Sequence, residues 1–280
     1  MASKATETIT HTSLDEEKQR AREQWEKDPC GAVAGRDEEF GTREFFDEVE
    51  RQRYQEYAPW MPGVMGFNQF GGKRLLEVGC GMGTDLLQFA RGGAICIGAD
   101  LTPRSIDISR LHFSVYGMRA EFLLADGERL PFPDKSFDVV YSNGVLHHTP
   151  DTAGAIRELH RVLKVGGTAK VMLYNRQSLN FWGEMMLHRG VVRGELFRGR
   201  SPEDIMSRWV EYSEHEGRPL VKAYTRKQAR ELFRDFANVK LQVEQLTRVE
   251  FPVVGRFMPQ TIFGFLSRTI GWNLIITATR

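Results

Sequence analysis

Short apolar runs that alternate with amphipathic stretches dominate the chain from Lys73 onward. The stretches between the runs predict helices over 84–93, 103–117 and 152–167. Strands separated by helices of this length form right-handed crossovers in a parallel sheet. The pattern therefore predicts an α/β fold, with a mainly parallel sheet and helices on both of its faces. The five runs rich in valine, isoleucine and leucine that predict these buried strands are 74–79, 94–100, 120–126, 137–143 and 169–175.

The residues before this alternating region predict two helices. Ser13 and Glu16 have the spacing of a capping box, and the helix that they open should end near residues 28–29. A second helix is predicted over 42–59. The residues expected on its buried side are Phe45, Phe46 and Val49.

After the fifth run the alternation is interrupted. Residues 176–224 do not continue it and predict an inserted helical cap. A helix over 225–236 and strands over 239–246 and 273–280 then resume the α/β pattern. A long apolar stretch, 251–271, separates these last two strands.

Composition narrows the class of protein. The 280 residues carry a formal net charge of +1 without a basic tract, which argues against a nucleic-acid partner. Cys30, Cys80 and Cys96 form no C-x-x-C pair, so neither a disulfide framework nor a zinc site is expected. No secretory signal and no apolar run long enough to span a bilayer is present. We therefore expect a soluble, cytoplasmic globular protein without a metal site.

A glycine-rich turn follows the first predicted strand in the sequence LLEVGCGMGTD. A dinucleotide-binding turn has the pattern G-x-G-x-x-G, which places the pyrophosphate on a helix N-terminus. Here the glycines are Gly79, Gly81 and Gly83, and Thr84 stands at the position of the third glycine of that pattern. The turn therefore predicts a nucleotide-type ligand but argues against a nicotinamide dinucleotide.

Three carboxylates fall at or near the ends of predicted strands. Glu77 lies on the first strand, Asp100 ends the second, and Asp126 ends the third and is followed by Gly127. Doubly wound sheets bind ligands at the carboxyl edge of their strands, where a carboxylate can accept hydrogen bonds from ribose hydroxyls. Any one of these acids alone could be a solvated loop residue, whereas all three in register with the strands indicate a binding site.

With these motifs the chain resembles a known family, the class I S-adenosylmethionine-dependent methyltransferases. It is similar to the small-molecule branch that includes ubiquinone and menaquinone biosynthesis enzymes. The resemblance covers roughly residues 73–174. The motifs that carry it are LLEVGCGMGTD, GADLT, LADGERLPFPDKSFDVVYSNGVLHHTPD and ELHRVLKVGGTAKVMLY.

The resemblance implies a Rossmann-like seven-stranded sheet with six parallel strands and an antiparallel seventh. Residues 73–280 would form the methyltransferase domain, with the cap inserted at about 176–224. Residues 1–72 would form a helical segment that covers the cofactor site. The apolar stretch 251–271 departs from the family pattern and suggests an elaborated wall for the methyl acceptor.

The resemblance also implies roles for individual residues. The glycines of the turn would approach the methionine moiety of S-adenosylmethionine, and Glu77 would help to place its amino group. Asp100 would accept from the ribose hydroxyls, Leu101 would pack on the adenine, and Asp126 would accept from the adenine amine. The residues assigned to cofactor binding are Glu77, Gly79, Gly81, Gly83, Asp85, Asp100, Leu101, Asp126, Gly127 and Asn143.

Methyl transfer requires the protein to orient the acceptor, to exclude water and, for some acceptors, to remove a proton from the acceptor. His147 and His148 follow the fourth predicted strand and titrate near neutral pH, so they are the candidate general bases, with His147 preferred. The alternative is that the pair caps the loop and closes the cofactor pocket. Tyr174, which ends the fifth strand, would orient the acceptor or pack in the core.

Other histidines and charges are weaker candidates. His112 and His160 lie within amphipathic helices and are expected to be ordinary, partly buried residues. Charged cap residues are usually solvated, although any one of them could touch the acceptor; they are His188, Arg189, His215, Glu216 and Arg218.

Two function classes are consistent with the sequence, and a third is disfavoured. The first is an enzyme that methylates a small-molecule acceptor at oxygen, nitrogen, sulfur or activated carbon, and the apolar stretch 251–271 leaves an apolar, quinone-like or lipid acceptor open. The second is a scaffold or regulator that keeps the methyltransferase fold and its cofactor without turnover. A nicotinamide oxidoreductase is a third reading, disfavoured by Thr84.

Overall fold

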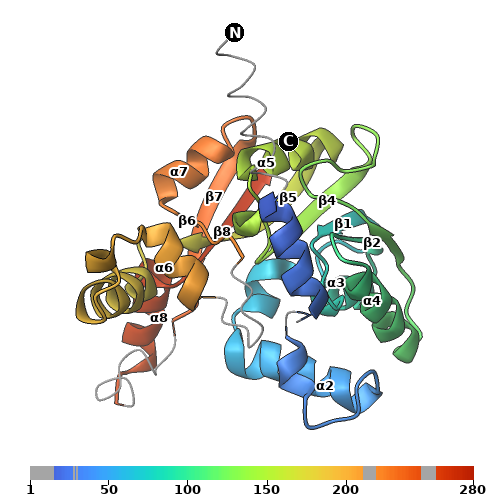
Figure 1. Ribbon diagram of the computed structural model, residues 1–280. Helices are drawn as coiled ribbons and strands as arrows, with labels where there is room; N and C mark the ends of the chain where they lie inside the picture. Colours follow the sequence, from blue (N-terminus) through green and yellow to red (C-terminus); the bar gives the residue numbers. More distant parts are fainter. Residues whose placement is uncertain (1–15, 28, 30, 211–218, 247–256) are drawn as a thin grey trace.

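An eight-stranded sheet forms the centre of the molecule (Figure 1). The computed structural model describes residues 16–27, 29, 31–210, 219–246 and 257–280. The strands are β1 (Arg74–Val78), β2 (Ile95–Asp100), β3 (Glu121–Leu124), β4 (Phe137–Asn143), β5 (Leu163–Asn175), β6 (Ala223–Tyr224), β7 (Ala237–Glu244) and β8 (Asn273–Thr279).

The strand order confirms the predicted topology. The sequence β3-β2-β1-β4-β5-β8-β7 runs across the sheet, and β6 is a short addition that pairs with β5. Strands β1 to β5 pair in parallel, whereas β8 is antiparallel to both of its neighbours, β5 and β7. The carboxyl ends of β1, β2, β3, β4 and β5 therefore meet at one edge, as parallel pairing requires.

One predicted boundary is displaced. The helix expected over 152–167 ends at Val162 as α5 (Thr152–Val162), and β5 begins at the next residue. The register between β4 and β5 shifts opposite this start, so Gly166 and Gly167 lie in an irregular part of the strand instead of stopping a helix. A Cβ at Gly167 would lie 2.8 Å from the carbonyl oxygen of Lys164, which explains why glycine stands there.

Helices cover both faces of the sheet. Helices α3 (Thr84–Arg91) and α4 (Pro103–Val115) lie on one face, where Leu86, Leu87 and Phe113 join one hydrophobic core. Helices α5 and α7 (Arg226–Leu232) lie on the other face, over a second core (Figure 1). The arrangement is the three-layered α/β architecture that the alternating pattern predicts.

The N-terminal part is helical, as predicted, but changes its helix type. Residues 16–27 are helical, and a 3₁₀ turn (Ala32–Gly35) follows. Helix α2 (Arg43–Arg51) is capped by the Thr42 side chain and continues directly as a π-helix, η2 (Gln52–Tyr57). A second π-helical turn, η3 (Pro62–Gly66), leads to β1. The expected buried residues of α2, Phe45, Phe46 and Val49, are buried, whereas Ser13 lies outside the described residues.

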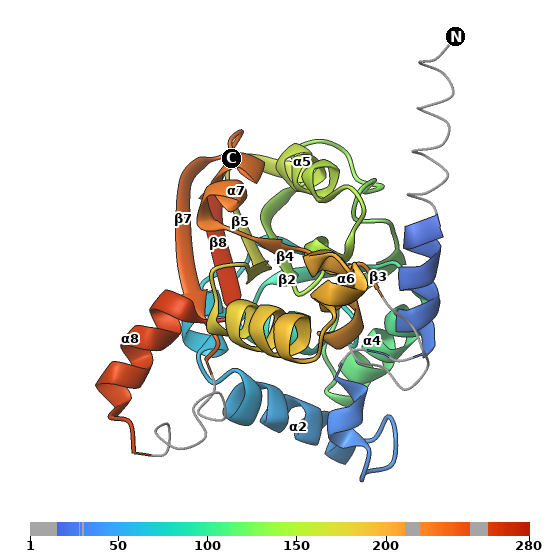
Figure 2. The same cartoon turned by 60° about the vertical axis from the view of Figure 1, so that its left-hand side comes forward.

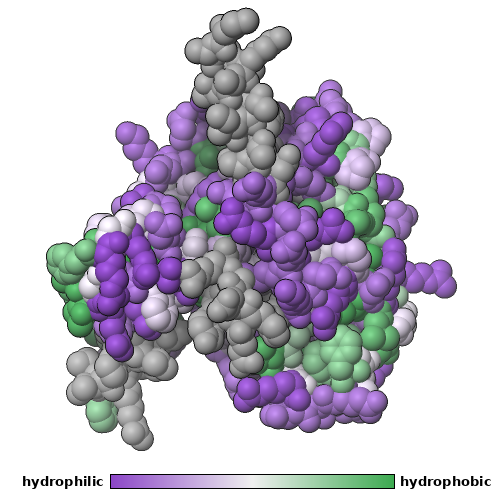
Figure 3. Space-filling view, viewed as in Figure 1, coloured by the Kyte–Doolittle hydropathy of each residue, from purple (hydrophilic) through white to green (hydrophobic). Residues whose placement is uncertain are grey.

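The cap after β5 is helical where it is described. It contains the π-helix η5 (Asn180–Val192), a 3₁₀ turn η6 (Leu196–Arg198) and α6 (Pro202–Trp209). Figure 3 shows apolar side chains gathered over the η5 region at the left of the view. Helix α8 (Gln260–Ile270) projects away from the sheet at the lower left of Figure 2. No helix of the described ranges is long and apolar enough to cross a membrane.

Candidate active site

A cavity of about 400 Å³ lies at the carboxyl edge of the sheet. Its wall includes the ends of β1, β2, β4 and β5 and the start of β8. The N-terminal helix 16–27 and the π-helix η2 supply further lining residues. The site is therefore built from segments more than 200 residues apart in the sequence, which the sheet topology brings together.

The glycine turn enters this site directly after β1. Gly79, Gly81 and Gly83 have φ angles of 74°, 53° and 75°, a backbone region that favours glycine. A Cβ at Gly79 would lie 2.3 Å from Val145 Cγ2, whereas a Cβ at Gly81 would meet no atom within 4 Å. The turn therefore combines one close approach to the protein with one open side where a ligand can come near the backbone.

Asp100 holds the turn in place. Its Oδ2 accepts a hydrogen bond from the Gly81 amide at 2.9 Å. Its Oδ1 accepts from both the amide and the hydroxyl of Thr102, each at 3.0 Å. Because a carboxylate oxygen accepts about two hydrogen bonds, Oδ2 has room for one ligand hydroxyl. Asp100 and the neighbouring Leu101 line the cavity, so their assigned contacts with ribose and adenine stay predictions with suitable geometry.

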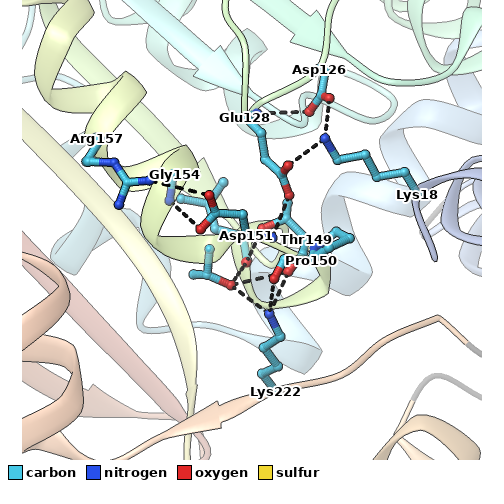
Figure 4. Close-up of polar contacts among 11 residues, drawn as sticks. Lys18, Asp126, Glu128, Thr149, Pro150, Asp151, Gly154, Arg157 and Lys222 are labelled. Carbon is cyan, nitrogen blue, oxygen red and sulfur yellow. Dashed lines mark hydrogen bonds and ion pairs between the residues drawn. The ribbon is translucent and has the colours of Figure 1, made fainter. Parts of the chain in front are cut away.

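Asp126 also lines the cavity, and Lys18 reaches it from helix 16–27 (Figure 4). Lys18 Nζ lies 2.8 Å from Asp126 Oδ2 and 2.5 Å from Glu128 Oε2. The other oxygen of Asp126 accepts from the Glu128 amide at 2.9 Å. Gly127 lies between these two acids on the cavity wall. Lys18 therefore fastens the N-terminal helix across the place where adenine binding is predicted.

Asp85 is the centre of a buried polar cluster. It accepts hydrogen bonds from Arg53 Nε and Nη2 at 2.6 and 2.7 Å. The Tyr54 and Tyr141 hydroxyls donate to it at 2.6 and 2.8 Å, and Asn143 Nδ2 lies at 3.4 Å. Burial raises the pKa of this carboxyl, but the charge and hydrogen bonds of Arg53 outweigh burial and hold the pKa below its ordinary value. The resemblance assigns Asp85 to cofactor binding. Because protein donors already occupy its oxygens, Asp85 would act on the cofactor indirectly, by positioning Arg53.

Two acceptor atoms beside this cluster have no hydrogen-bond partner among the described residues. They are Glu77 Oε2 and Asn143 Oδ1, and both residues line the cavity. Burial, with the nearby charge of Asp85, raises the pKa of Glu77 well above its ordinary value. A buried acceptor without a donor is costly, so this part of the wall suits a ligand that brings N–H groups. The ammonium group of S-adenosylmethionine is such a donor, and the residues present fit that cofactor.

The structure separates the two candidate bases. His148 lines the cavity, whereas His147 is fully buried behind it. The His147 ring lies between His148, at a centroid distance of 4.3 Å, and Tyr174, at 3.8 Å. Burial, followed by the charge of His148, lowers the pKa of His147 well below its ordinary value. Tyr174 lines the cavity and stacks on Trp272 at 4.5 Å. Of the two candidate bases His148 therefore lines the cavity and His147, the preferred candidate, does not; which of them acts as a base stays a prediction.

The cap does not contribute to the described cavity wall. His188 and Arg189 contact Glu184 within η5, and neither lines the cavity. The remaining cap candidates, His215, Glu216 and Arg218, lie outside the described residues. His160 also lies away from the cavity, and His112 is a fully buried core residue.

Arg53 and Lys18 are site residues that the sequence analysis missed. Both come from the N-terminal part, where no motif marks them, and both act across long sequence separations on Asp85 and Asp126. A charged residue on an otherwise solvated helix gives no signal of its partner. The structure alone identifies them.

Comparisons with known proteins agree with this geometry. The family model of a methyltransferase domain matches residues 76–171. The ubiquinone biosynthesis O-methyltransferase of Cereibacter sphaeroides is 35% identical over 112 residues, which cover 40% of this chain and 45% of that protein. The 27-O-demethylrifamycin SV methyltransferase of Amycolatopsis mediterranei is 36% identical over 99 residues, 34% of this chain and 36% of that protein. The match thus spans less than half the length of these relatives.

Solved structures with the same fold include a SAM-dependent methyltransferase from Methanosarcina mazei. It has a TM-score of 0.53 and 21% identity, and the match covers 78% of this chain and 97% of that chain. The [4+2]-cyclase SpnF has a TM-score of 0.52 and 20% identity, with 84% and 81% covered. At these identities the structures establish the fold alone. Together with the glycine turn, the strand order and the matching family model, they identify residues 76–171 as a methyltransferase domain in a sheet with the class I methyltransferase fold.

Proposed function

We propose that this protein transfers the methyl group of S-adenosylmethionine to a largely apolar small molecule without a negative charge. The observation that carries the proposal is a single cavity whose wall combines two kinds of surface. One part consists of the glycine turn and the strand-end carboxylates, which suit the cofactor. The other part includes Met61, Met172 and Tyr174, which suit an apolar acceptor. Ligand pockets commonly combine an apolar lining with a few placed polar groups.

The charges on the wall argue against an anionic acceptor. The lysine and arginine side chains on the described wall are Lys18 and Arg53. Each is already paired with carboxylates, Lys18 with Asp126 and Glu128 and Arg53 with Asp85. A negatively charged acceptor would therefore be buried without a counter-ion, which is unfavourable.

When bound, S-adenosylmethionine supplies an electrophilic methyl group on its sulfonium. The chain must then hold the acceptor in line with that group and keep water out. Helix 16–27 and η2 cover the cavity and serve the second task. Held geometry of this kind can supply about 7–11 kcal/mol of the barrier reduction.

Where the acceptor loses a proton, His148 is the residue placed to take it. Its Nδ1 donates to the carbonyl oxygen of Leu220 at 2.8 Å, so Nδ1 carries the proton of the neutral ring. The lone pair then lies on Nε2, which is the atom that acts as a base. His147 and Tyr174 would support the orientation of this ring. A loop-capping role for the two histidines stays the alternative.

Calorimetric titration of the protein with S-adenosylmethionine, S-adenosylhomocysteine and NAD tests the cofactor. We expect the first two to bind and NAD not to bind. Incubation with S-adenosylmethionine and extracted cell metabolites, followed by mass spectrometry, then identifies an acceptor by a gain of one methylene mass. Binding of the cofactor with no product from any extract would favour the scaffold hypothesis.

A further inference from the structure

We propose that the cap docks on the surface of a membrane that contains anionic lipids, through an exposed face made of apolar residues and arginines. This inference goes beyond methyl transfer and does not depend on the cofactor. The residues of this cap face are Trp182, Leu187, Val191, Val192, Arg193, Leu196, Phe197 and Arg198.

Exposed apolar side chains are concentrated in this part of the chain. In the described ranges sixteen large apolar residues are exposed, and six of them lie between residues 182 and 197. Phe197 is 80% exposed and Val192 is 70% exposed. Single exposed apolar residues are ordinary on a protein surface, whereas a group of them marks a contact site. The cap face therefore indicates a partner that takes up apolar side chains.

Helix η5 explains how this face forms. On one side of the helix Phe181, Met185 and Met186 are buried and join the hydrophobic core that also contains residues of α6. The other side carries further apolar residues, and these are exposed. A helix that is apolar all round is normally buried, either in a large core or in lipid. Packing against the protein therefore accounts for only one side of η5.

The charge on the outside of the cap face is positive. Every exposed residue of 187–200 is apolar, a glycine or an arginine. The one acidic residue of this segment, Glu195, is buried and forms ion pairs with Arg198 and Arg200. Arg193 is exposed, and no ion pair joins it to a described residue. An anionic surface would therefore meet arginines in this segment and no exposed carboxylate.

Charge and shape favour a bilayer over other partners. A second copy of the chain in a symmetric contact would bring Arg193 and Arg198 close to the same arginines of its partner, which is unfavourable. A side chain that protrudes as far as Phe197 needs a shaped pocket in a protein partner, whereas a fluid lipid interface accepts it directly. A nucleic acid would match the arginines but not the apolar majority of the face.

Helix α8 adds a second apolar surface on the same side of the molecule. Figure 1 shows α8 and the cap at the left, away from α3 and α4. Ile262 and Phe265 of this helix are exposed, and residues 257–270 include no acidic residue. The same lipid surface can therefore take up the exposed side chains of α8.

Sedimentation of the full chain with lipid vesicles tests the proposal. The protein should bind vesicles of mixed phosphatidylcholine and phosphatidylglycerol, and it should bind pure phosphatidylcholine vesicles much more weakly, with a loss of binding at high salt. Arg193→Gln/Arg198→Gln should lower the affinity for the anionic vesicles by about 30-fold, or about fivefold for each arginine. Val192→Ser/Phe197→Ser should lower it by about 10- to 150-fold, as expected for the burial of one large apolar side chain.

Two control variants remove comparable exposed residues outside the cap face. Arg110→Gln on α4 and Val165→Ser on β5, where the valine is 77% exposed, should both bind vesicles like the wild type. Circular dichroism shows whether each variant is folded. Neither this measurement nor vesicle binding needs a cofactor, so both remain valid even if the proposed methyl transfer is wrong.

The proposal is overturned if the wild type does not bind anionic vesicles, or if it binds neutral vesicles equally well. Equal vesicle binding by the cap variants and the controls also overturns it. A dimer in solution that does not bind vesicles, and that Val192→Ser/Phe197→Ser separates into monomers, would instead assign the cap face to a second copy of the chain.

Discussion

The fold should lose stability in mild acid because of His112. This residue is fully buried on α4, where its Nδ1 donates to the carbonyl oxygen of Met82 at 2.8 Å. Its ring stacks on Phe46 of α2 at a centroid distance of 4.0 Å. Burial lowers the pKa of His112 to about 4, and the Arg91 charge adds to this. The histidine joins the glycine turn to the N-terminal segment, and the folded state favours its neutral form because a charge on the ring would be buried.

The sign of the pH dependence follows from the pKa of His112 in the unfolded chain and its pKa in the folded chain. The unfolded chain binds the proton near pH 6.5, and the folded chain only near pH 4. Between these values the unfolded state holds more protons, so stability falls as the pH falls. At 1.36 kcal/mol for each pKa unit, the whole difference is worth about 3 kcal/mol, of which about 2 kcal/mol is lost between pH 7 and pH 5.

Urea denaturation of the wild type and of His112→Phe at pH 7, 6 and 5 measures this effect. The variant keeps the stack on Phe46 but leaves the Met82 carbonyl without a donor, so it should be less stable than the wild type at pH 7. Its free energy of unfolding should nevertheless fall by about 2 kcal/mol less than that of the wild type between pH 7 and pH 5. His188→Gln, which removes an exposed ring that contacts Glu184, serves as the control and should follow the wild type. Parallel curves for wild type and His112→Phe would refute the reasoning.

Three further outcomes are expected. Lys18→Gln removes two partly exposed ion pairs, so amide exchange in helix 16–27 should accelerate by about 2- to 30-fold. The acceleration should be smaller at high salt, which screens these pairs already in the wild type. Arg22→Gln on the same helix is the control and should leave the exchange rate unchanged. Asp100→Ala should weaken binding of S-adenosylhomocysteine by about 10- to 150-fold in calorimetry, and an unchanged affinity would remove this residue from the site. Once an acceptor is known, His148→Gln should lower kcat by about 10²–10⁴-fold and remove a limb of the pH–rate profile, with cofactor affinity nearly unchanged. If His147→Phe alone has this effect, the assignment of the base to His148 is wrong.

The sheet could be predicted from the sequence because its signals are local. Each parallel strand is a short apolar run between a glycine or proline signal and an amphipathic stretch, and the carboxylates are attached to strand ends. The place of Glu77 and Asp100 at the ends of their strands therefore predicts that both line the site. The early start of β5 at Leu163 was not predicted, because the pairing of 163–168 with β4 depends on a partner strand rather than on its own pattern.

The remaining site residues depend on features without a sequence signature. An apolar periodicity over 42–59 predicts a helix but not its change to a π-helix after Arg51, and that change places both Arg53 and Tyr54 against Asp85. His147 and His148 lie in a 3₁₀ turn, where successive side chains point about 120° apart. Adjacent histidines therefore point in different directions, and the order of residues cannot decide which one reaches the cavity.

The strand order has a consequence for how the chain is made. In the described sheet β7 pairs only with β8, and β8 separates it from β5. During synthesis β7 leaves the ribosome first and has no neighbour until β8 follows. Strand β1, which leads into the glycine turn, and its neighbours β2 and β4 can associate long before that moment. A nascent chain should therefore form its nucleotide half early, while the wall around Trp272 and Asn273 waits for β8. That interval is when the unpaired edge of β5 is most exposed to aggregation.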